Sequence, residues 1–295
     1  MKLGSYIQGF TSGVQSPSTI KLLRNSLILV TAYLILVLCL PNAQLFWGEH
    51  SLMPSLGFPD SWRYKIIMAL HQDGYGNLYP LFFLSIGLGG VLYFFNGFNR
   101  IATFLVWLGV IVLYNRAYLS MVGGNYLLQS LLFFLIFADE SSHAKGKWKV
   151  ISDTLSNLAL WACKLQVIYV YIFSGAYKLA SEQWMSGEAV FDILHLKEFS
   201  LPLIMEYLDS FHGILVIIDY VAIAYFILFP FLIWSKKWKV PLLIFGVIWH
   251  LGMGWGIGVM DFSFIMIASY AAFLEEDDII VFKRLFTRRI KVGQT

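Results

Sequence analysis

Eight apolar runs, interpreted as helical membrane spans, dominate this sequence. A transmembrane helix needs about 20 mostly apolar residues, because the hydrocarbon core of a bilayer is about 30 Å thick. Only 13% of the chain is charged, whereas a soluble domain carries about 25%. The pattern therefore predicts an all-α polytopic membrane protein with about eight transmembrane helices. The expected spans are residues 25–46, 78–97, 101–118, 122–138, 157–178, 213–234, 241–259 and 261–275.

The distribution of positive charge predicts the orientation of these spans. With the N-terminus in the cytoplasm, 15 lysine and arginine residues fall in inner segments, 5 in outer segments and Lys164 within a span. Cytoplasmic loops of membrane proteins carry such an excess, so we expect both termini in the cytoplasm. The expected parts are a cytoplasmic or interfacial segment (1–24), a transmembrane bundle (25–276) and a basic cytoplasmic tail (277–295) that meets anionic lipid headgroups.

Two outer segments are too long to be simple turns, and each predicts additional helix. Residues 47–77 contain a patterned piece, Arg63 to His71, that is typical of a surface helix. Residues 179–212 contain EAVFDILHLKEF, in which apolar residues recur at helical spacing with charges between them. This pattern predicts an interfacial amphipathic helix, or a helix packed over the outer mouth of the bundle.

Several functional classes lack their sequence signatures. The two cysteines, Cys39 and Cys163, lie in apolar runs and form no CxxC pair. The six histidines are scattered without metal-ligand spacing, so we expect no metal site. Basic residues flank the spans, as topology requires, and predict no nucleic-acid partner. The first apolar run has the length of a span rather than of a signal peptide, so we expect a retained first helix.

Lys178 is the most informative charged residue. Fourteen residues separate it from Lys164, which corresponds to about 21 Å of helix against a core of about 30 Å. At least one of the two lysines must therefore lie below the membrane surface or snorkel strongly. Either Lys178 pairs with Glu182, four residues later, or it is a desolvated lysine able to act as a base.

Four other polar residues fall within or beside the spans. Asp219 lies in VIIDYVAIAY and His250 in the glycine-rich run IFGVIWHLGMGWG. Intramembrane charges are functional candidates, although mutual pairing of Asp219 with a lysine or with His250 would also satisfy them. Arg116 and Asn125 lie near an outer turn, where Arg116 is either a clamp for a carboxylate or phosphate or a plain interfacial anchor.

The stretch GAYKLASEQWMSGEA resembles the signature of the HTTM superfamily, the transmembrane region shared with vitamin K-dependent gamma-glutamyl carboxylase. Weaker similarities follow in the same order around Asp219 and His250, and the resemblance covers most of residues 25–275. The matching residues of the signature are Gly175, Lys178, Leu179, Trp184 and Gly187.

The resemblance implies an extracytoplasmic site in which Lys178 is the base that deprotonates a reduced quinone, the one cofactor implied. Two differences argue against carboxylation of a protein substrate. Asn125 stands where the carboxylase has a functional histidine. We also expect no counterpart of the large lumenal domain that grips the glutamate-rich substrate.

Short bacterial members of the superfamily are similar to sporulation-delaying protein B, an accessory membrane protein needed to mature a secreted peptide toxin. The resemblance therefore implies a multi-pass protein of the bacterial inner membrane that takes a secreted peptide and a small partner protein. The expected catalytic residues are Lys178, Asp219 and His250. The expected substrate- or quinone-binding residues are Asn125, Arg116, Trp184 and Glu182.

Two other functions remain open from the sequence. One is a quinone-dependent carboxylase or epoxidase of the same fold, which requires Lys178 to face a pocket at the outer leaflet. The other is a non-catalytic structural or redox subunit, or a transporter. Broken helices with paired charges at mid-membrane would favour transport, and a Lys178–Glu182 pair open to water would favour a structural role.

Overall fold

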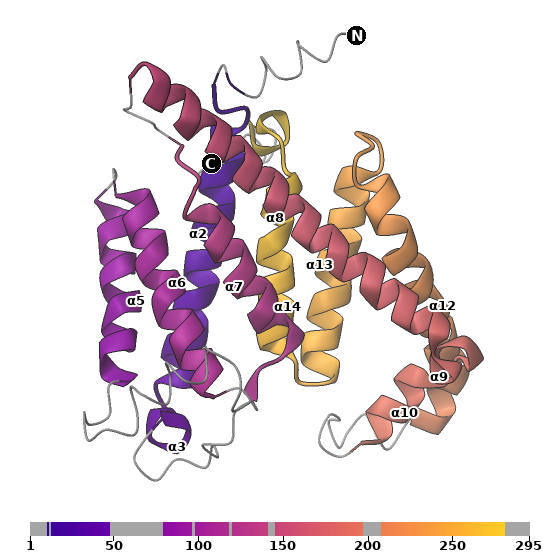
Figure 1. Ribbon diagram of the computed structural model, residues 1–295. Helices are drawn as coiled ribbons and strands as arrows, with labels where there is room; N and C mark the ends of the chain where they lie inside the picture. Colours follow the sequence, from indigo (N-terminus) through magenta and orange to yellow (C-terminus); the bar gives the residue numbers. More distant parts are fainter. Residues whose placement is uncertain are drawn as a thin grey trace, which may run out of the picture. The chain divides into compact units, whose positions relative to one another are not determined.

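The chain is helical throughout the part that the structure describes. The computed structural model describes residues 11, 13–47, 79–95, 98–117, 120–140, 145–196 and 208–280. Within these ranges every regular element is a helix (Figure 1). The elements are α2 (Pro17–Tyr33), η1 (Leu34–Cys39), α3 (Ala43–Trp47), α5 (Tyr79–Phe94), α6 (Asn99–Arg116), α7 (Gly123–Leu135), α8 (Lys147–Ala180), α9 (Glu182–Ser186), α10 (Ala189–His195), α12 (Leu208–Leu232), α13 (Lys239–Gly256), α14 (Met260–Ser269) and η3 (Tyr270–Phe273).

Three helices of the described ranges are long and apolar enough to cross a membrane. They are Pro17–Cys39, which joins α2 to the π-helical η1, together with α8 and Ser210–Leu232 of α12. Two of them have 23 residues and are therefore about 35 Å long. Shorter apolar helices occupy Tyr79–Phe94, Asn99–Asn115 and Met260–Phe273.

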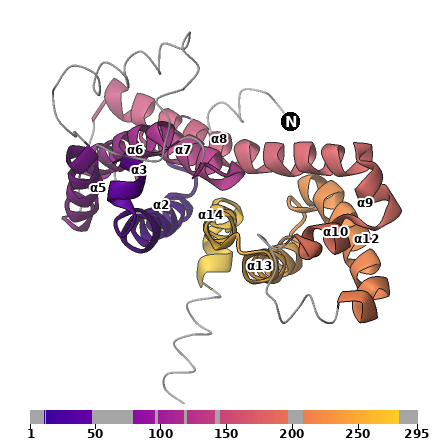
Figure 2. The same ribbon diagram turned by 90° about the horizontal axis from the view of Figure 1, so that it is seen from below.

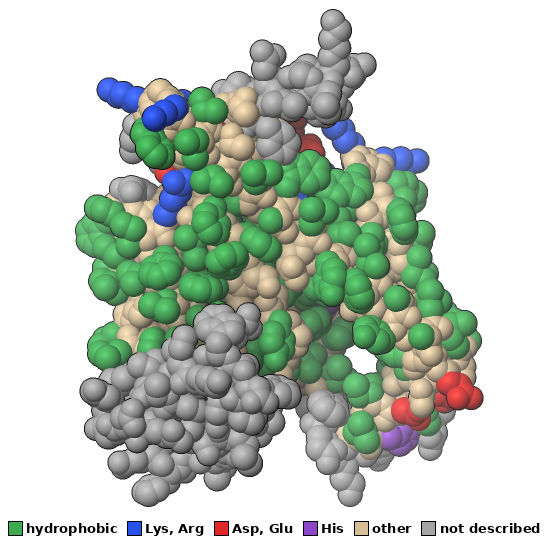
Figure 3. Space-filling view, in the orientation of Figure 1, with side chains coloured by type: hydrophobic (Ala, Val, Ile, Leu, Met, Phe, Trp, Pro, Cys, Tyr) green, Lys and Arg blue, Asp and Glu red, His purple; other side chains and the backbone are tan. Residues whose placement is uncertain are grey.

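Large apolar side chains remain exposed on the described helices, as expected of a chain surrounded by lipid. Hydrophobic side chains cover most of the described surface in Figure 3. On α12 the exposed fraction is 62% for Ile217 and 72% for Phe231. Contiguous exposed apolar surface of this kind marks an interaction surface, and a bilayer satisfies it without further protein.

Helix boundaries differ from the predicted spans at two places. The first helix begins at Pro17 rather than near residue 25, and α8 begins at Lys147 rather than 157. Polar contacts join the segment just before α2 to α8. The Asn157 side chain accepts a hydrogen bond from the Gln15 N–H (2.8 Å) and donates one to the Gly13 carbonyl (2.9 Å).

The chain divides into two compact units, each described here by itself. Unit 1 contains residues 1–163 and 274–295, and unit 2 contains residues 164–273. The division falls inside α8, whose first half belongs to unit 1 and whose second half belongs to unit 2. The predicted surface helix at Arg63–His71 lies outside the described residues, as does most of the basic tail.

In unit 1, α5 and α6 pack closely because each has a glycine at the contact. The two helices lie side by side in Figures 1 and 2. A Cβ atom on Gly89 would lie 2.7 Å from the Ala102 carbonyl oxygen, and one on Gly109 would overlap Ile86. The Ser85 hydroxyl also donates to the Leu105 carbonyl (2.7 Å). Small residues permit the same close approach in other membrane helices.

A buried arginine on α2 donates hydrogen bonds to carbonyl groups at the C-terminal end of α7. The last carbonyl groups of a helix have no partner within it and must find one elsewhere. Arg24 has no exposed surface and donates to the carbonyls of Leu135 (3.0 Å) and Ala138 (2.7 Å). Its charge is balanced by an ion pair with Glu140, which also accepts a bond from Asn99 at the start of α6 (2.8 Å).

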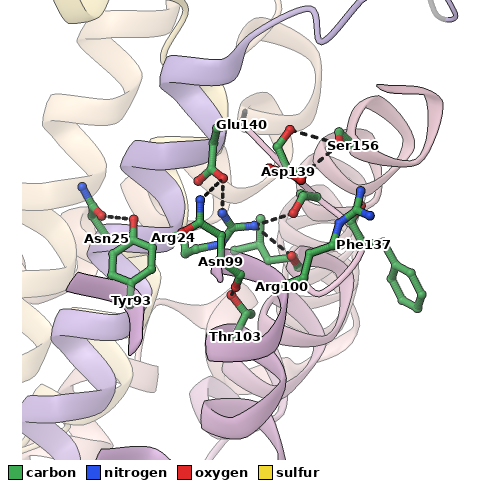
Figure 4. Close-up of polar contacts among 12 residues, drawn as sticks. Arg24, Asn25, Tyr93, Asn99, Arg100, Thr103, Phe137, Asp139, Glu140 and Ser156 are labelled. Carbon is green, nitrogen blue, oxygen red and sulfur yellow. Dashed lines mark hydrogen bonds and ion pairs between the residues drawn. The ribbon is translucent and has the colours of Figure 1, made fainter. Parts of the chain in front are cut away.

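A second arginine, Arg100, also donates a hydrogen bond to a carbonyl group just after α7. Arg100 of α6 donates to the Phe137 carbonyl (3.1 Å) and contacts the Ser152 hydroxyl of α8 at 2.8 Å. The Asp139 N–H donates to the Ser156 hydroxyl, again on α8 (2.9 Å). Figure 4 shows that these side chains converge from separate helices. We call the cluster of Arg24, Asn99, Arg100, Asp139, Glu140, Ser152 and Ser156 the arginine clasp.

In unit 2, the predicted amphipathic segment is α10, and it packs on α12. Leu194 of α10 and Leu215 of α12 are buried together and are surrounded by partly buried neighbours such as Ile218. The two helices are adjacent in Figures 1 and 2. The apolar face of α10 is thus covered by α12.

Candidate functional site

The candidate site is built on one face of the second half of α8. Tyr171, Gly175 and Lys178 are spaced i, i+4 and i+7 and therefore lie on the same side of the helix. Tyr171 is fully buried. A Cβ atom on Gly175 would lie 3.5 Å from Phe226 and Ile227, so this glycine brings α8 close to α12.

The amine of Lys178 lies between two aromatic rings. Its Nζ atom is 4.0 Å from the ring centroid of Trp184 and 4.6 Å from that of Phe226. A cation over an aromatic face is stabilised by about 0.5–2 kcal/mol, more where water is excluded. Among the described residues Lys178 forms no ion pair, and Glu182 is exposed at the start of α9. The Lys178–Glu182 pair that the sequence allowed is absent from these contacts.

Gly187 follows the helical turn that carries Trp184. It ends the short helix α9 in the left-handed conformation (φ 81°), which glycine adopts without strain. The N–H of Glu188 then bonds the Gln183 carbonyl at 2.9 Å. A Cβ atom on Gly187 would also lie 2.8 Å from Val216 of α12. The spacing of Trp184 and Gly187 in the sequence thus encodes a sharp turn that returns the chain to α12.

Asp219 lies near Lys178 and holds the start of α10. Its buried carboxylate accepts the N–H of Val190 at 3.2 and 3.3 Å. A carboxylate is favourable at the N-terminal end of a helix, where N–H groups lack partners. Asp219 and Lys178 also attract each other electrostatically. Two of the three predicted catalytic residues, Lys178 and Asp219, therefore interact electrostatically.

His250 joins the site indirectly. The imidazole has no exposed surface, and its Nε2 atom lies 3.3 Å from the Tyr171 hydroxyl. The Tyr171 ring packs against Phe226 at 5.0 Å, and Phe226 contacts the lysine. Asp219 is not among the groups that contact His250, so the Asp219–His250 pair that the sequence allowed is not formed in the described residues.

The predicted residues near the outer turn belong to unit 1. The Asn125 side chain accepts the Val122 N–H (2.8 Å) and so closes the first turn of α7. Arg116 ends α6, but its side chain lies outside the described part of the chain. Asn125 thus has a local role in starting a helix.

Sequence reasoning missed Tyr171 and Phe226. A signal for Tyr171 existed, because it lies seven residues before Lys178 and so shares its helix face. Phe226 has the same relation to Asp219 on α12. Neither residue type indicates chemistry by itself in a chain with 17% aromatic residues.

The arrangement can hold and exchange one proton. A half-buried amine between two rings, with one carboxylate acting on it from nearby, is suited to binding a cation or to accepting a proton from a bound molecule. Comparison with protein-family models, with curated proteins and with solved structures gave no match for this chain.

Proposed function

We propose that this chain is a multi-pass protein of the bacterial inner membrane that acts in the maturation of a secreted peptide. Its site lies around Lys178 and faces the extracytoplasmic side. The proposal includes eight transmembrane helices, both termini in the cytoplasm, and membership of the HTTM superfamily. Its partners are membrane lipid, the exported peptide and a small partner protein.

The topology is supported by the positions of helices and charges. A helix occurs at the position of each of the eight predicted spans, and three of these helices are long and apolar enough to cross a membrane. Lys236 and Lys237 lie in the connection between α12 and α13, where cytoplasmic charge is expected. The residues of α9 and α10, which the same rule assigns to the outside, include acidic side chains but no lysine or arginine.

The observation that carries the proposal is the environment of the Lys178 amine. Trp184 and Phe226 cover it, and no carboxylate among the described residues lies within ion-pair distance. A lysine kept only for stability in a membrane is expected to be paired or to reach the headgroups. In the proposed function Lys178 accepts a proton, and Asp219 stabilises the charged amine that results.

Substitution of Lys178 tests this function. The Lys178→Met variant keeps the length of the side chain and removes the amine, so we expect it to insert normally but to yield at least tenfold less mature peptide. The readout is the amount of mature peptide in the medium of cells that co-express a candidate peptide from a neighbouring gene. Membrane levels of the variant are measured by immunoblotting.

The matched control is Lys149→Met on the same helix. Lys149 pairs with Asp153 in unit 1 and has half of its side chain exposed, so its loss should leave the peptide yield unchanged. Normal maturation in Lys178→Met would contradict a role for the amine.

A further inference from the structure

The first turns of α8 are polar on their buried side and apolar on their exposed side. The buried polar residues are Ser152, Asp153, Ser156 and Asn157. The exposed apolar residues, which we call the α8 stripe, are Trp148, Ile151, Leu155 and Leu158. The exposed fraction is 64% for the first member of the stripe and 52% for the last. A helix that borders water has the opposite distribution, so this exposed side is suited to lipid.

Contacts with other parts of unit 1 hold the polar side of these turns inward. The Ser152 hydroxyl accepts a hydrogen bond from Arg100 of α6 at 2.8 Å. The Asn157 amide donates to the Gly13 carbonyl at 2.9 Å. Rotation of α8 about its axis would break both hydrogen bonds, and a buried polar group that loses its partner is costly. The α8 stripe therefore stays on the outer side of the helix.

Positive charge gathers where the α8 stripe begins. From Lys145 to the end of the stripe the chain has three lysines and one aspartate, a net charge of +2. Lys149 pairs with the aspartate, Asp153, at 2.6 Å. Lys145 and Lys147 are exposed and form no ion pair among the described residues. The Lys147 Nζ atom lies 5.7 Å from the ring centroid of Trp148, so one cation lies directly beside the first apolar side chain.

The length of α8 places its ends at the level of lipid headgroups. The helix has 34 residues and is therefore about 51 Å long. The hydrocarbon core is about 30 Å thick, so the helix extends beyond the core at the usual tilt of about 20°. Tryptophan side chains are enriched at the headgroup level, and lysines at a membrane surface attract anionic lipids.

We propose that the start of α8 is a binding site for an anionic phospholipid, separate from Lys178. Lys145 and Lys147 contact the headgroup, and Trp148 with the rest of the α8 stripe lies along an acyl chain. A zwitterionic phospholipid offers the same apolar contact without net charge, so it binds more weakly. Lipid rather than a protein is the occupant, because the stripe belongs to a helix that is long and apolar enough to cross a membrane.

The test is quenching of Trp148 fluorescence by brominated phospholipid in vesicles that contain the full chain. The vesicles hold equal amounts of phosphatidylglycerol, which is anionic, and phosphatidylcholine, which is zwitterionic, and only one of the two lipids carries bromine. The chain has ten tryptophans, so the Trp148 signal is the difference between the unmodified protein and Trp148→Phe. We expect brominated phosphatidylglycerol to quench this signal more strongly, with a relative binding constant of at least about fivefold.

The Lys145→Met/Lys147→Met variant should lose this preference, although both lipids should still quench Trp148 because the stripe remains. The matched control is Lys236→Met/Lys237→Met, which removes the same charge from two exposed residues of unit 2 and should keep the preference. Equal quenching by the two lipids in the unmodified protein would overturn the proposal, as would a preference that survives in the first variant. Absence of quenching by either lipid would show that protein or water covers Trp148 and would equally overturn it. None of these outcomes depends on the proposed function.

Discussion

The buried contacts among Tyr171, Tyr225, Tyr270 and His250 require a glycine at position 246. The hydroxyl groups of Tyr225 and Tyr270 occupy the space that a Cβ atom of Gly246 would need. Four residues separate Gly246 from His250, so both lie on the buried face of α13. One glycine therefore lets α12, α13 and η3 bring their polar groups together inside an apolar unit.

A methyl group at this position should disturb these contacts. Gly246→Ala overlaps both hydroxyls, and overpacking of this kind costs about 1–3 kcal/mol. We therefore expect a lower unfolding temperature in detergent by circular dichroism. Gly252→Ala on the same helix is the matched control, because a Cβ atom there meets no atom within 4 Å. Equal melting temperatures for the two variants would show that the hydroxyls can move aside at little cost.

The sequence identified single site residues better than it predicted which residues contact one another. Lys178 and Trp184 were identified together, and the structure brings them into contact. Glu182 was placed with them by its spacing of four residues, yet α8 ends at Ala180 and α9 turns this side chain outward. A helical spacing rule applies only while the helix continues, and sequence alone did not locate this break.

At the scale of helices, the arginine clasp joins α2, α6, α7 and α8 of unit 1. Removal of Arg24 leaves the Glu140 carboxylate and the carbonyls of Leu135 and Ala138 without this partner. Breaking a buried ion pair on one side costs about 3–5 kcal/mol. Loss of Arg24 alone is therefore expected to destabilise unit 1.

The Arg24→Met variant should lower both the thermal stability of the protein and its steady-state level in membranes. Lys21→Met is the control, because Lys21 is exposed on the same helix. The double variant Arg24→Met/Glu140→Gln should recover part of the loss, since it also removes the orphaned charge. If Arg24→Met unfolds at the same temperature as the unmodified protein, the ion pair makes no net contribution to the stability.

Helix positions followed from the apolar runs, whereas helix ends did not. Residues in the early turns of α2 and α8 make contacts with residues far apart in sequence, such as Thr19 with Leu274 and Ser152 with Arg100. Hydropathy cannot reveal them, because the side chains involved are polar. The clasp was missed for the same reason, since Arg24, Arg100 and Glu140 read in sequence only as charges flanking spans.

At the scale of the whole molecule, the proposed topology can be tested by cysteine labelling. Cys39 and Cys163 are buried and should react little with a membrane-impermeant maleimide. New cysteines at Lys147 and Lys236, both exposed, should be labelled only in inverted vesicles. Cysteines at Glu182 and Asp192, also exposed, should be labelled in intact spheroplasts. Labelling of all four sites from one side would contradict the eight-span arrangement.

The composition of unit 1 has a consequence for the synthesis of the chain. Thr19, at the start of α2, donates a hydrogen bond to the Leu274 carbonyl (2.6 Å), across a separation of 255 residues. A ribosome adds about 5–20 residues per second, so Leu274 follows Thr19 by roughly 13–50 s at those rates. All of unit 2 is translated in the interval. The unit that contains α2 is therefore completed only after all of unit 2 has been made.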